Sequence, residues 1–185
     1  IEDEDEDTSL AIWEAAWAGE LGVCHFPWEF GAASSIRTKK ANGSTPMWAA
    51  CYSGHLHVAK WLFEVGAAGD IRIKNSFGSS LMLAMCYKGH LDVAKWLYAV
   101  GAAADIRSKD SIDRTPMYIA CMCGHLHVAK WLFAVGAAAD IRTRNVDGFT
   151  PMYVACSDGH LDVATWLFEV GAAEDIRTPS IAGRT

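Results

Sequence analysis

Residues 150–161 read Thr-Pro-Met-Tyr-Val-Ala-Cys-Ser-Asp-Gly-His-Leu, and this stretch predicts two short helices separated by a tight turn. The hydroxyl of Thr150 can accept a hydrogen bond from an N–H at the helix start, and Pro151 is tolerated at the first helical position. Gly159 is expected to end this helix, because glycine enters the left-handed conformation without steric cost. A second helix should follow, since apolar residues then recur at helical spacing until Gly171.

This helix–turn–helix unit recurs along the chain with a period of 35 residues. The phrase Gly-His-Leu stands at residues 54–56, 89–91, 124–126 and 159–161. Shifting back by the same period leads to Gly19-Glu20-Leu21, which marks a degenerate copy near the N-terminus. Because one such unit cannot bury its apolar face alone, stability must come from stacking on neighbouring units in a solenoid.

The repeat register divides the chain into expected segments. They are an acidic tail at 1–8, a degenerate repeat at 9–43, full repeats at 44–78, 79–113, 114–148 and 149–183, and the start of a further unit or an end at 184–185. The unit that starts at Ser80 lacks Thr-Pro, so its first helix is expected to begin less sharply. The segment after each second helix contains Asp-Ile-Arg and turn residues, and is expected to be an extended finger or hairpin.

The skeleton Thr-Pro-x-x-x-Ala-x-x-x-Gly-His-Leu at 45–56, 115–126 and 150–161 resembles the ankyrin repeat. The resemblance implies an all-α fold with short β-hairpin fingers, in an ankyrin-type helix–turn–helix solenoid of about five repeats. The unit is longer than the usual one of about 33 residues, and Trp-rich units of this length are similar to arrays in protists and algae. The His of the usual Thr-Pro-Leu-His is replaced by Trp48, Leu83, Tyr118 and Tyr153.

The resemblance also implies a function. Ankyrin arrays are non-catalytic scaffolds or adaptors that bind another protein through their fingers and first helices, on a concave face. The positions that vary between the copies are the expected contact residues: Phe77, Arg114 and Phe149 around the fingers, and Tyr52, Tyr87, Lys88, Met122 and Ser157 late in the first helix. A stably bound structural subunit of a larger complex is the first alternative.

A second alternative is a metal or redox module. Cys121, Cys123, His125 and His127 are four potential metal ligands close together in the sequence. The repeat register favours a structural role, because one position is shared by Cys51, Cys86, Cys121 and Cys156 and another by His55, His90, His125 and His160. We therefore expect neither a metal nor a cofactor.

Two further ladders follow the same period. Arginines stand at 37, 72, 107, 142 and 177, and an aspartate precedes four of them by two positions, at 70, 105, 140 and 175. We expect each aspartate to neutralise the arginine of its own segment, so nucleic-acid binding is not expected. The series Trp61, Trp96, Trp131 and Trp166 lies at helical spacing beside leucines, which is typical of core packing.

The composition fits a folded chain without catalytic machinery. Hydrophobic residues make up 51% and charged residues 21%, and the net charge is -6. No apolar stretch approaches the roughly 20 residues of a membrane span. The sequence contains no phosphate-binding loop and no nucleophile elbow, so no enzymatic activity is expected. Six cysteines without an expected disulfide favour a reducing intracellular compartment, such as the cytoplasm, nucleus or an organelle interior.

Overall fold

The computed structural model describes the backbone of residues 2–29 and 35–177, and the side chains of residues 10–25 and 35–175. The chain forms two compact units, Ile1–Ser76 and Phe77–Thr185, and each is treated by itself. Every regular element in the described residues is a helix, which confirms the all-α class.

The first unit contains two helix pairs. Its elements are α1 (Glu2–Ala18), α2 (Leu21–Glu29), η1 (Ser35–Arg37), α3 (Pro46–Tyr52), α4 (Leu56–Leu62), the π-helical turn η2 (Phe63–Ala67) and the 3-10 helix η3 (Ala68–Arg72). Helix α1 packs on both α2 and α3, and α3 packs on α4.

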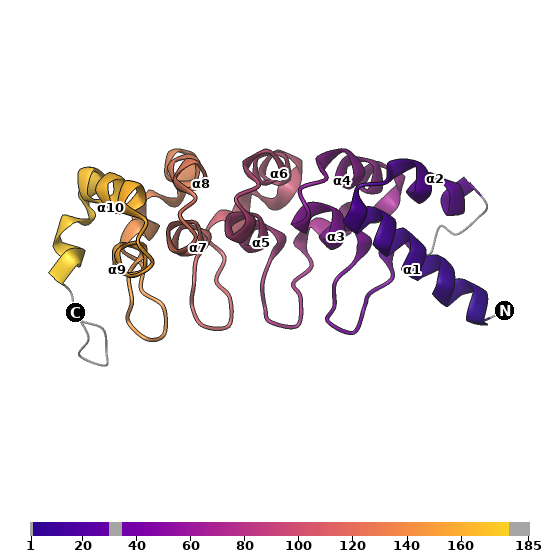
Figure 1. Ribbon diagram of the computed structural model, residues 1–185, viewed down its shortest axis with the longest axis horizontal. Coiled ribbons are helices and arrows are strands. Elements are labelled where there is room, and N and C mark those ends of the chain that lie inside the picture. The colour runs from indigo at the N-terminus through magenta and orange to yellow at the C-terminus, as the bar shows by residue number, and fades with distance from the viewer. Residues whose placement is uncertain (1, 30–34, 178–185) are drawn as a thin grey trace. The chain divides into compact units, whose positions relative to one another are not determined.

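The second unit contains three helix pairs, each followed by a π-helical turn and a 3-10 helix. The elements are α5 (Leu81–Lys88), α6 (Leu91–Leu97), η4 (Tyr98–Ala102), η5 (Ala103–Arg107), α7 (Pro116–Met122), α8 (Leu126–Leu132), η6 (Phe133–Ala137), η7 (Ala138–Arg142), α9 (Pro151–Ser157), α10 (Leu161–Leu167), η8 (Phe168–Ala172) and η9 (Ala173–Arg177). Helix α7 packs between α5 and α9, and the loops that precede α7 and α9 project away from the row of α6, α8 and α10 (Figure 1).

Hydroxyl caps begin the first helix of each full repeat. Thr115 accepts a hydrogen bond from the N–H of Tyr118 at 3.2 Å, and Thr150 accepts one from the N–H of Tyr153 at the same distance. Ser80 does the same for Leu83 at 3.4 Å. The expectation of a less sharp start after Ser80 is therefore wrong, because the serine hydroxyl supplies the cap and no proline is needed.

The expected β-hairpin fingers are absent from the described residues, which contain no strand. The Asp-Ile-Arg segments form 3-10 helices, and the fingers are closed by side chains. The Asp110 carboxylate accepts hydrogen bonds from the N–H groups of Ile112 and Arg114, at 3.1 and 2.9 Å. Asn145 accepts in the same way from Asp147 and Phe149. These side chains satisfy the backbone donors that a β-ladder would need.

The acidic run also differs from the expected separate tail at 1–8. Helix α1 begins at Glu2, so the backbone of this run belongs to the first helix. Carboxylates are favourable in the first turns of a helix, where they meet the positive end of its dipole. The side chains of residues 1–9, the side chain of Arg177 and all of residues 184–185 lie outside the described residues.

The core of each repeat lies between its two helices. In α7 and α8, Met117, Cys121 and Leu132 are fully buried. The four tryptophans at this repeat position differ in burial. Trp61 and Trp166 are buried, whereas Trp96 and Trp131 are only half-buried. The expectation of core packing therefore holds fully for two of the four indoles.

Candidate functional site

The arginine ladder joins neighbouring repeats. In the second unit, Nη2 of Arg107 donates to the buried Asp140 at 2.8 Å, and Nη2 of Arg142 donates to Asp175 at 3.2 Å. In the first unit, Nε of Arg37 donates to Asp70 at 2.9 Å. Each acceptor lies 33 positions later in the sequence, so the expected pairing within one segment is wrong.

These ion pairs link the guanidinium groups to buried carboxylates. Hydrogen bonds that Arg107 donates to Asp140 raise the pKa of Arg107, and hydrogen bonds that Arg142 donates to Asp175 and Glu174 raise the pKa of Arg142. Each pair neutralises one charge of the ladder, although the guanidinium side chains remain about half exposed and keep further N–H donors. This arrangement gives the ladder a role in joining repeats.

The histidines at the start of the second helices also join repeats. In the second unit, Nε2 of His125 lies 3.1 Å from the carbonyl oxygen of Tyr87, and Nε2 of His160 lies 3.0 Å from that of Met122. Nε2 of His127 lies 3.0 Å from the carbonyl oxygen of Gly89. A carbonyl only accepts hydrogen bonds, so each Nε2 carries the proton.

The metal alternative finds no support in this geometry. The described residues contain no group of three or more His, Cys, Asp or Glu side chains that could hold a metal ion. His125 and His127 direct Nε2 to backbone carbonyls of the preceding repeat. Burial raises the pKa of Cys121 and of Cys123, which disfavours the thiolates that a metal requires. All six cysteines are free thiols.

His125 makes the stability of the second unit depend on pH. Burial lowers the pKa of His125 below its ordinary value of 6.5 despite the hydrogen bond to Tyr87, and His127, His160 and His90 lower it further. The unfolded chain therefore binds this proton more tightly than the folded chain does, and stability is lost as the pH falls below about 6.5. We expect urea midpoints to fall between about pH 7.5 and 5.5.

The matched variant for this prediction is His125→Gln, which removes the titrating group. Its urea midpoint should fall less over the same pH interval than that of the unchanged chain. An equal fall in the two chains would assign the pH dependence to other groups.

The residues predicted to contact a partner lie on the fingers and first helices, and their exposure differs. In the second unit, the side chain of Phe77 is 72% exposed and that of Tyr87 is 50% exposed. Lys88 and Ser157 are also exposed, and Met122 is half-buried.

Arg114 and Phe149 are held by their own finger. Nε of Arg114 donates to Asp110 at 2.7 Å, so this cation is part of the closed loop. Phe149 is half-buried and stacks on Tyr153, with ring centroids 4.4 Å apart. Both residues shape the surface, and a substitution at either would also disturb the finger.

Sequence reasoning missed two apolar side chains on the finger tips. Ile112 is 39% exposed and Val146 is 49% exposed. The N–H of Val146 donates to the carbonyl oxygen of Ile112 at 3.1 Å, so these tips are neighbours. A signal was available, because Ile112 occupies the position of Phe77 one repeat later.

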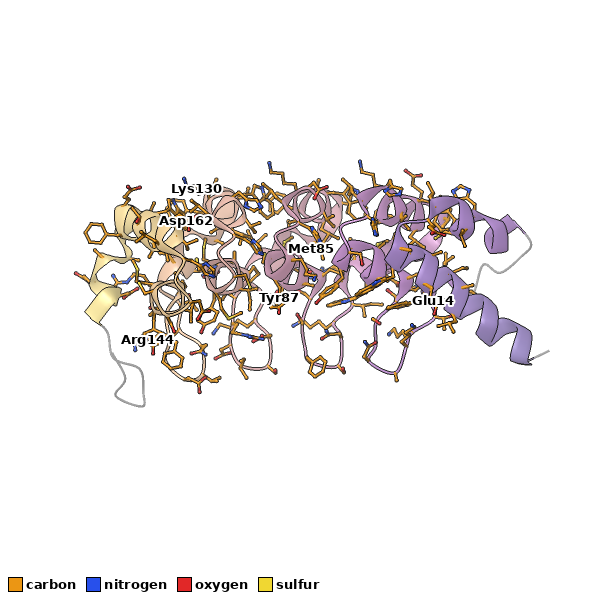
Figure 2. The ribbon with its side chains drawn as sticks, in the orientation of Figure 1. Glu14, Met85, Tyr87, Lys130, Arg144 and Asp162 are labelled. Carbon is orange, nitrogen blue, oxygen red and sulfur yellow. The ribbon has the colours of Figure 1, made fainter. Side chains whose placement is uncertain are left out.

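The opposite side of the second unit is charged. Asp92, Lys95, Lys130 and Asp162 are exposed on the second helices. Figure 2 shows Lys130 and Asp162 on this side, whereas Tyr87 and Arg144 lie toward the fingers. Among the large apolar side chains that are exposed in the second unit, those outside the last helix pair lie on the finger side. They are Phe77, Tyr87, Ile112 and Val146.

Tyr52 belongs to an aromatic cluster within the first unit. Its ring lies 5.6 Å from that of Trp17, which lies 5.3 Å from that of Trp13. Nζ of Lys40 lies 3.4 Å from the centre of the Trp13 ring. Tyr52 is thus half-buried by aromatic neighbours that the sequence did not suggest.

The family comparison matches most of the chain. Residues 12–110 and 81–178 each match the family model described as ankyrin repeats (3 copies). No curated protein matches the chain. Among the described residues, no helix is both long enough and apolar enough to cross a lipid bilayer.

Proposed function

The chain belongs to the ankyrin repeat family, and on this premise we propose that its second unit binds another protein through its fingers and first helices. Ankyrin repeats are generally protein-interaction modules and typically non-catalytic. The observation that carries the proposal is the exposure of Phe77 and Tyr87 on the finger side, opposite a charged surface.

These two side chains have the properties of interface anchors. Aromatic residues are enriched among the few positions that dominate binding energy, and they bury a large area at a small cost in conformational entropy. Monomeric proteins seldom expose several large apolar groups together unless the surface is used. Ile112 and Val146 extend the apolar surface along the finger tips.

The charges of the fingers support an apolar contact surface. Arg114 pairs with Asp110, and Nζ of Lys109 lies 3.6 Å from the carboxylate of Asp113. Paired charges at a rim contribute specificity more than affinity. We therefore propose a partner segment that places apolar side chains against Phe77 and Tyr87.

The test compares two double variants of the chain. Phe77→Ala/Tyr87→Ala removes the anchors, and Lys130→Ala/Asp162→Ala removes two exposed side chains from the opposite side as the control. A partner is first captured by crosslinking and identified by mass spectrometry, and its affinity for each chain is then measured by calorimetry. We expect the first variant to weaken binding by about 30-fold or more, and the control to bind like the unchanged chain.

Equal thermal stability of the three chains shows that binding alone has changed. Unchanged affinity of the Phe77→Ala/Tyr87→Ala variant would place the contact elsewhere. A partner that never dissociates during purification would indicate the alternative role of a permanent structural subunit.

A further inference from the structure

The first helix of the chain is longer than the first helices of the full repeats. Leu10 occupies the register position at which those repeats carry a helix-capping hydroxyl, namely that of Thr45, Ser80, Thr115 and Thr150. Leucine has no hydroxyl to cap a helix at this point, and α1 continues back to Glu2. Its N-terminal turns extend away from α3 and α4 (Figure 1). First helices of seven or eight residues suffice for stacking in the full repeats, so the extra turns of α1 are not needed for it.

An exposed apolar surface lies on α1 directly after these turns. The side chain of Leu10 is 43% exposed and that of Trp17 is 44% exposed. Leu10, Trp13 and Trp17 stand at positions i, i+3 and i+7, so they share one side of the helix. Tyr52 of α3 continues this side, because its ring lies 5.6 Å from that of Trp17. We call Leu10, Trp13, Trp17 and Tyr52 the aromatic face of the first unit.

The rings of the aromatic face are held in place by one another. Trp13 and Trp17 stack with an angle of 11° between their planes, and Trp17 and Tyr52 stack with an angle of 25°. Side chains that are already fixed lose little conformational freedom when a partner binds. A preformed and partly exposed tryptophan is the kind of residue that dominates the binding energy of protein interfaces. The aromatic face thus has the properties of a binding surface.

The charge around the aromatic face is negative. Residues 2–7 are all Glu or Asp and belong to α1, and the sequence contains no Lys or Arg before Arg37. Glu14, which Figure 2 labels on α1, is exposed and lies one helical turn from both Leu10 and Trp17. Such a surface repels nucleic acids and anionic membranes and attracts cations. The charge therefore favours a basic polypeptide as the partner.

The chain itself places a cation on the aromatic face. Nζ of Lys40 lies 3.4 Å from the centre of the Trp13 ring. Lys40 stands at the register position of Asp110, whose carboxylate closes a later finger. In the first finger Asn42 has this role, because its Oδ1 accepts a hydrogen bond from the N–H of Ser44 at 3.0 Å. Lys40 is therefore available to contact the indole, and the contact shows that this face accepts an ammonium group.

From these observations we infer that the aromatic face binds a polypeptide segment in which Lys or Arg side chains stand beside large apolar ones. The apolar side chains of this segment pack against Leu10 and the exposed part of Trp17. Its cations face Glu14 and the acidic turns of α1. This contact is separate from the one proposed for Phe77 and Tyr87 in the second unit, and neither contact requires the other.

The test uses a defined basic peptide, which consists of two copies of Leu-Lys-Lys-Leu-Leu-Lys-Leu. Its matched control has Glu in place of every Lys. Binding of each fluorescently labelled peptide to the full chain is measured by fluorescence anisotropy. We expect the lysine peptide to bind with a Kd below about 100 μM, and the glutamate peptide to bind at least about tenfold more weakly. Raising NaCl from about 50 to about 500 mM should weaken binding of the lysine peptide several-fold, because salt screens the attraction between exposed charges.

Two single variants test the contribution of the aromatic face. Trp17→Ala should weaken binding of the lysine peptide by about tenfold or more, and Leu10→Ser by about threefold or more. Leu10→Ser leaves the three stacked rings in place, so it keeps the test decisive if thermal melts show that Trp17→Ala destabilises the first unit. The controls are Phe168→Ala, which removes another exposed ring, and Phe77→Ala/Tyr87→Ala. Both controls should bind the lysine peptide like the unchanged chain.

Three results would overturn the inference. One is a Kd above about 100 μM for the lysine peptide. Another is equal affinity of the Leu10→Ser variant and the unchanged chain, which would mean that the acidic turns alone attract the peptide. The third is loss of binding in the Phe77→Ala/Tyr87→Ala variant, which would assign the peptide to the second unit and leave the function proposed for that unit intact.

Discussion

Replacement of Leu132 by alanine is expected to lower the free energy of unfolding by about 3–4 kcal/mol. Leu132 is fully buried at the end of α8, in the middle repeat of the second unit. The loss combines the transfer free energy of the deleted methyl groups with the cost of the cavity that remains. Urea denaturation followed by circular dichroism measures it.

The matched control is Leu161→Ala, which deletes the same atoms from an exposed position at the start of α10. Leu161 is 78% exposed, so its truncation should change the free energy of unfolding by no more than about 0.5 kcal/mol. Similar losses in the two variants would mean that Leu161 is covered in solution.

The parts of the fold that depend on local rules could be predicted from the sequence. A hydroxyl before Pro116 caps the helix, and a left-handed glycine such as Gly124 ends it, because both effects act within one turn of the chain. The period of 35 then fixed the number of helix pairs. The sequence did not predict the finger conformation, because the side chains of Asp110 and Asn145 accept hydrogen bonds from backbone N–H groups that would otherwise pair between β-strands.

Pairing between repeats could not be predicted in the same way. Asp105 and Asp140 occupy the same position in successive repeats, and the sequence does not say which of them Arg107 reaches. The distance between stacked repeats determines which aspartate Arg107 reaches, and in the structure that aspartate is Asp140. In a series of identical motifs, the sequence does not determine which repeat supplies the partner of a given side chain, because every repeat carries the same arginine and aspartate.

The exposure of the candidate contact residues could be predicted in part, for a related reason. Variation between repeats predicts Phe77 and Tyr87 as surface residues, and both are exposed. The exposure of Ile112 and Val146 was not predicted, because aliphatic residues usually lie in the core. At a finger tip no neighbouring helix covers them. The exposure of Cys156 was missed because the repeat register treats the last repeat like an internal one.

Replacement of Gly124 by alanine is expected to lower the free energy of unfolding by about 3 kcal/mol. About 1–2 kcal/mol comes from holding an alanine at a φ of 72°. The remainder comes from the new Cβ, which would lie 2.5 Å from Nδ1 of His160 and force the imidazole away from the Met122 carbonyl. Gly159→Ala should lose only the first part, because its φ is 79° and its Cβ meets no described atom within 4 Å.

A double-mutant cycle with His160→Ala isolates the contribution of the imidazole. The single His160→Ala variant should lose about 1 kcal/mol, since it removes one hydrogen bond to the Met122 carbonyl. In the Gly124→Ala/His160→Ala variant the alanine methyl fills part of the space left by the ring. The combined loss should therefore be smaller than the sum of the single losses by at least about 1 kcal/mol. Strict additivity would mean that backbone strain alone accounts for the glycine, and that the histidine does not hold α9 and α10 against the preceding repeat.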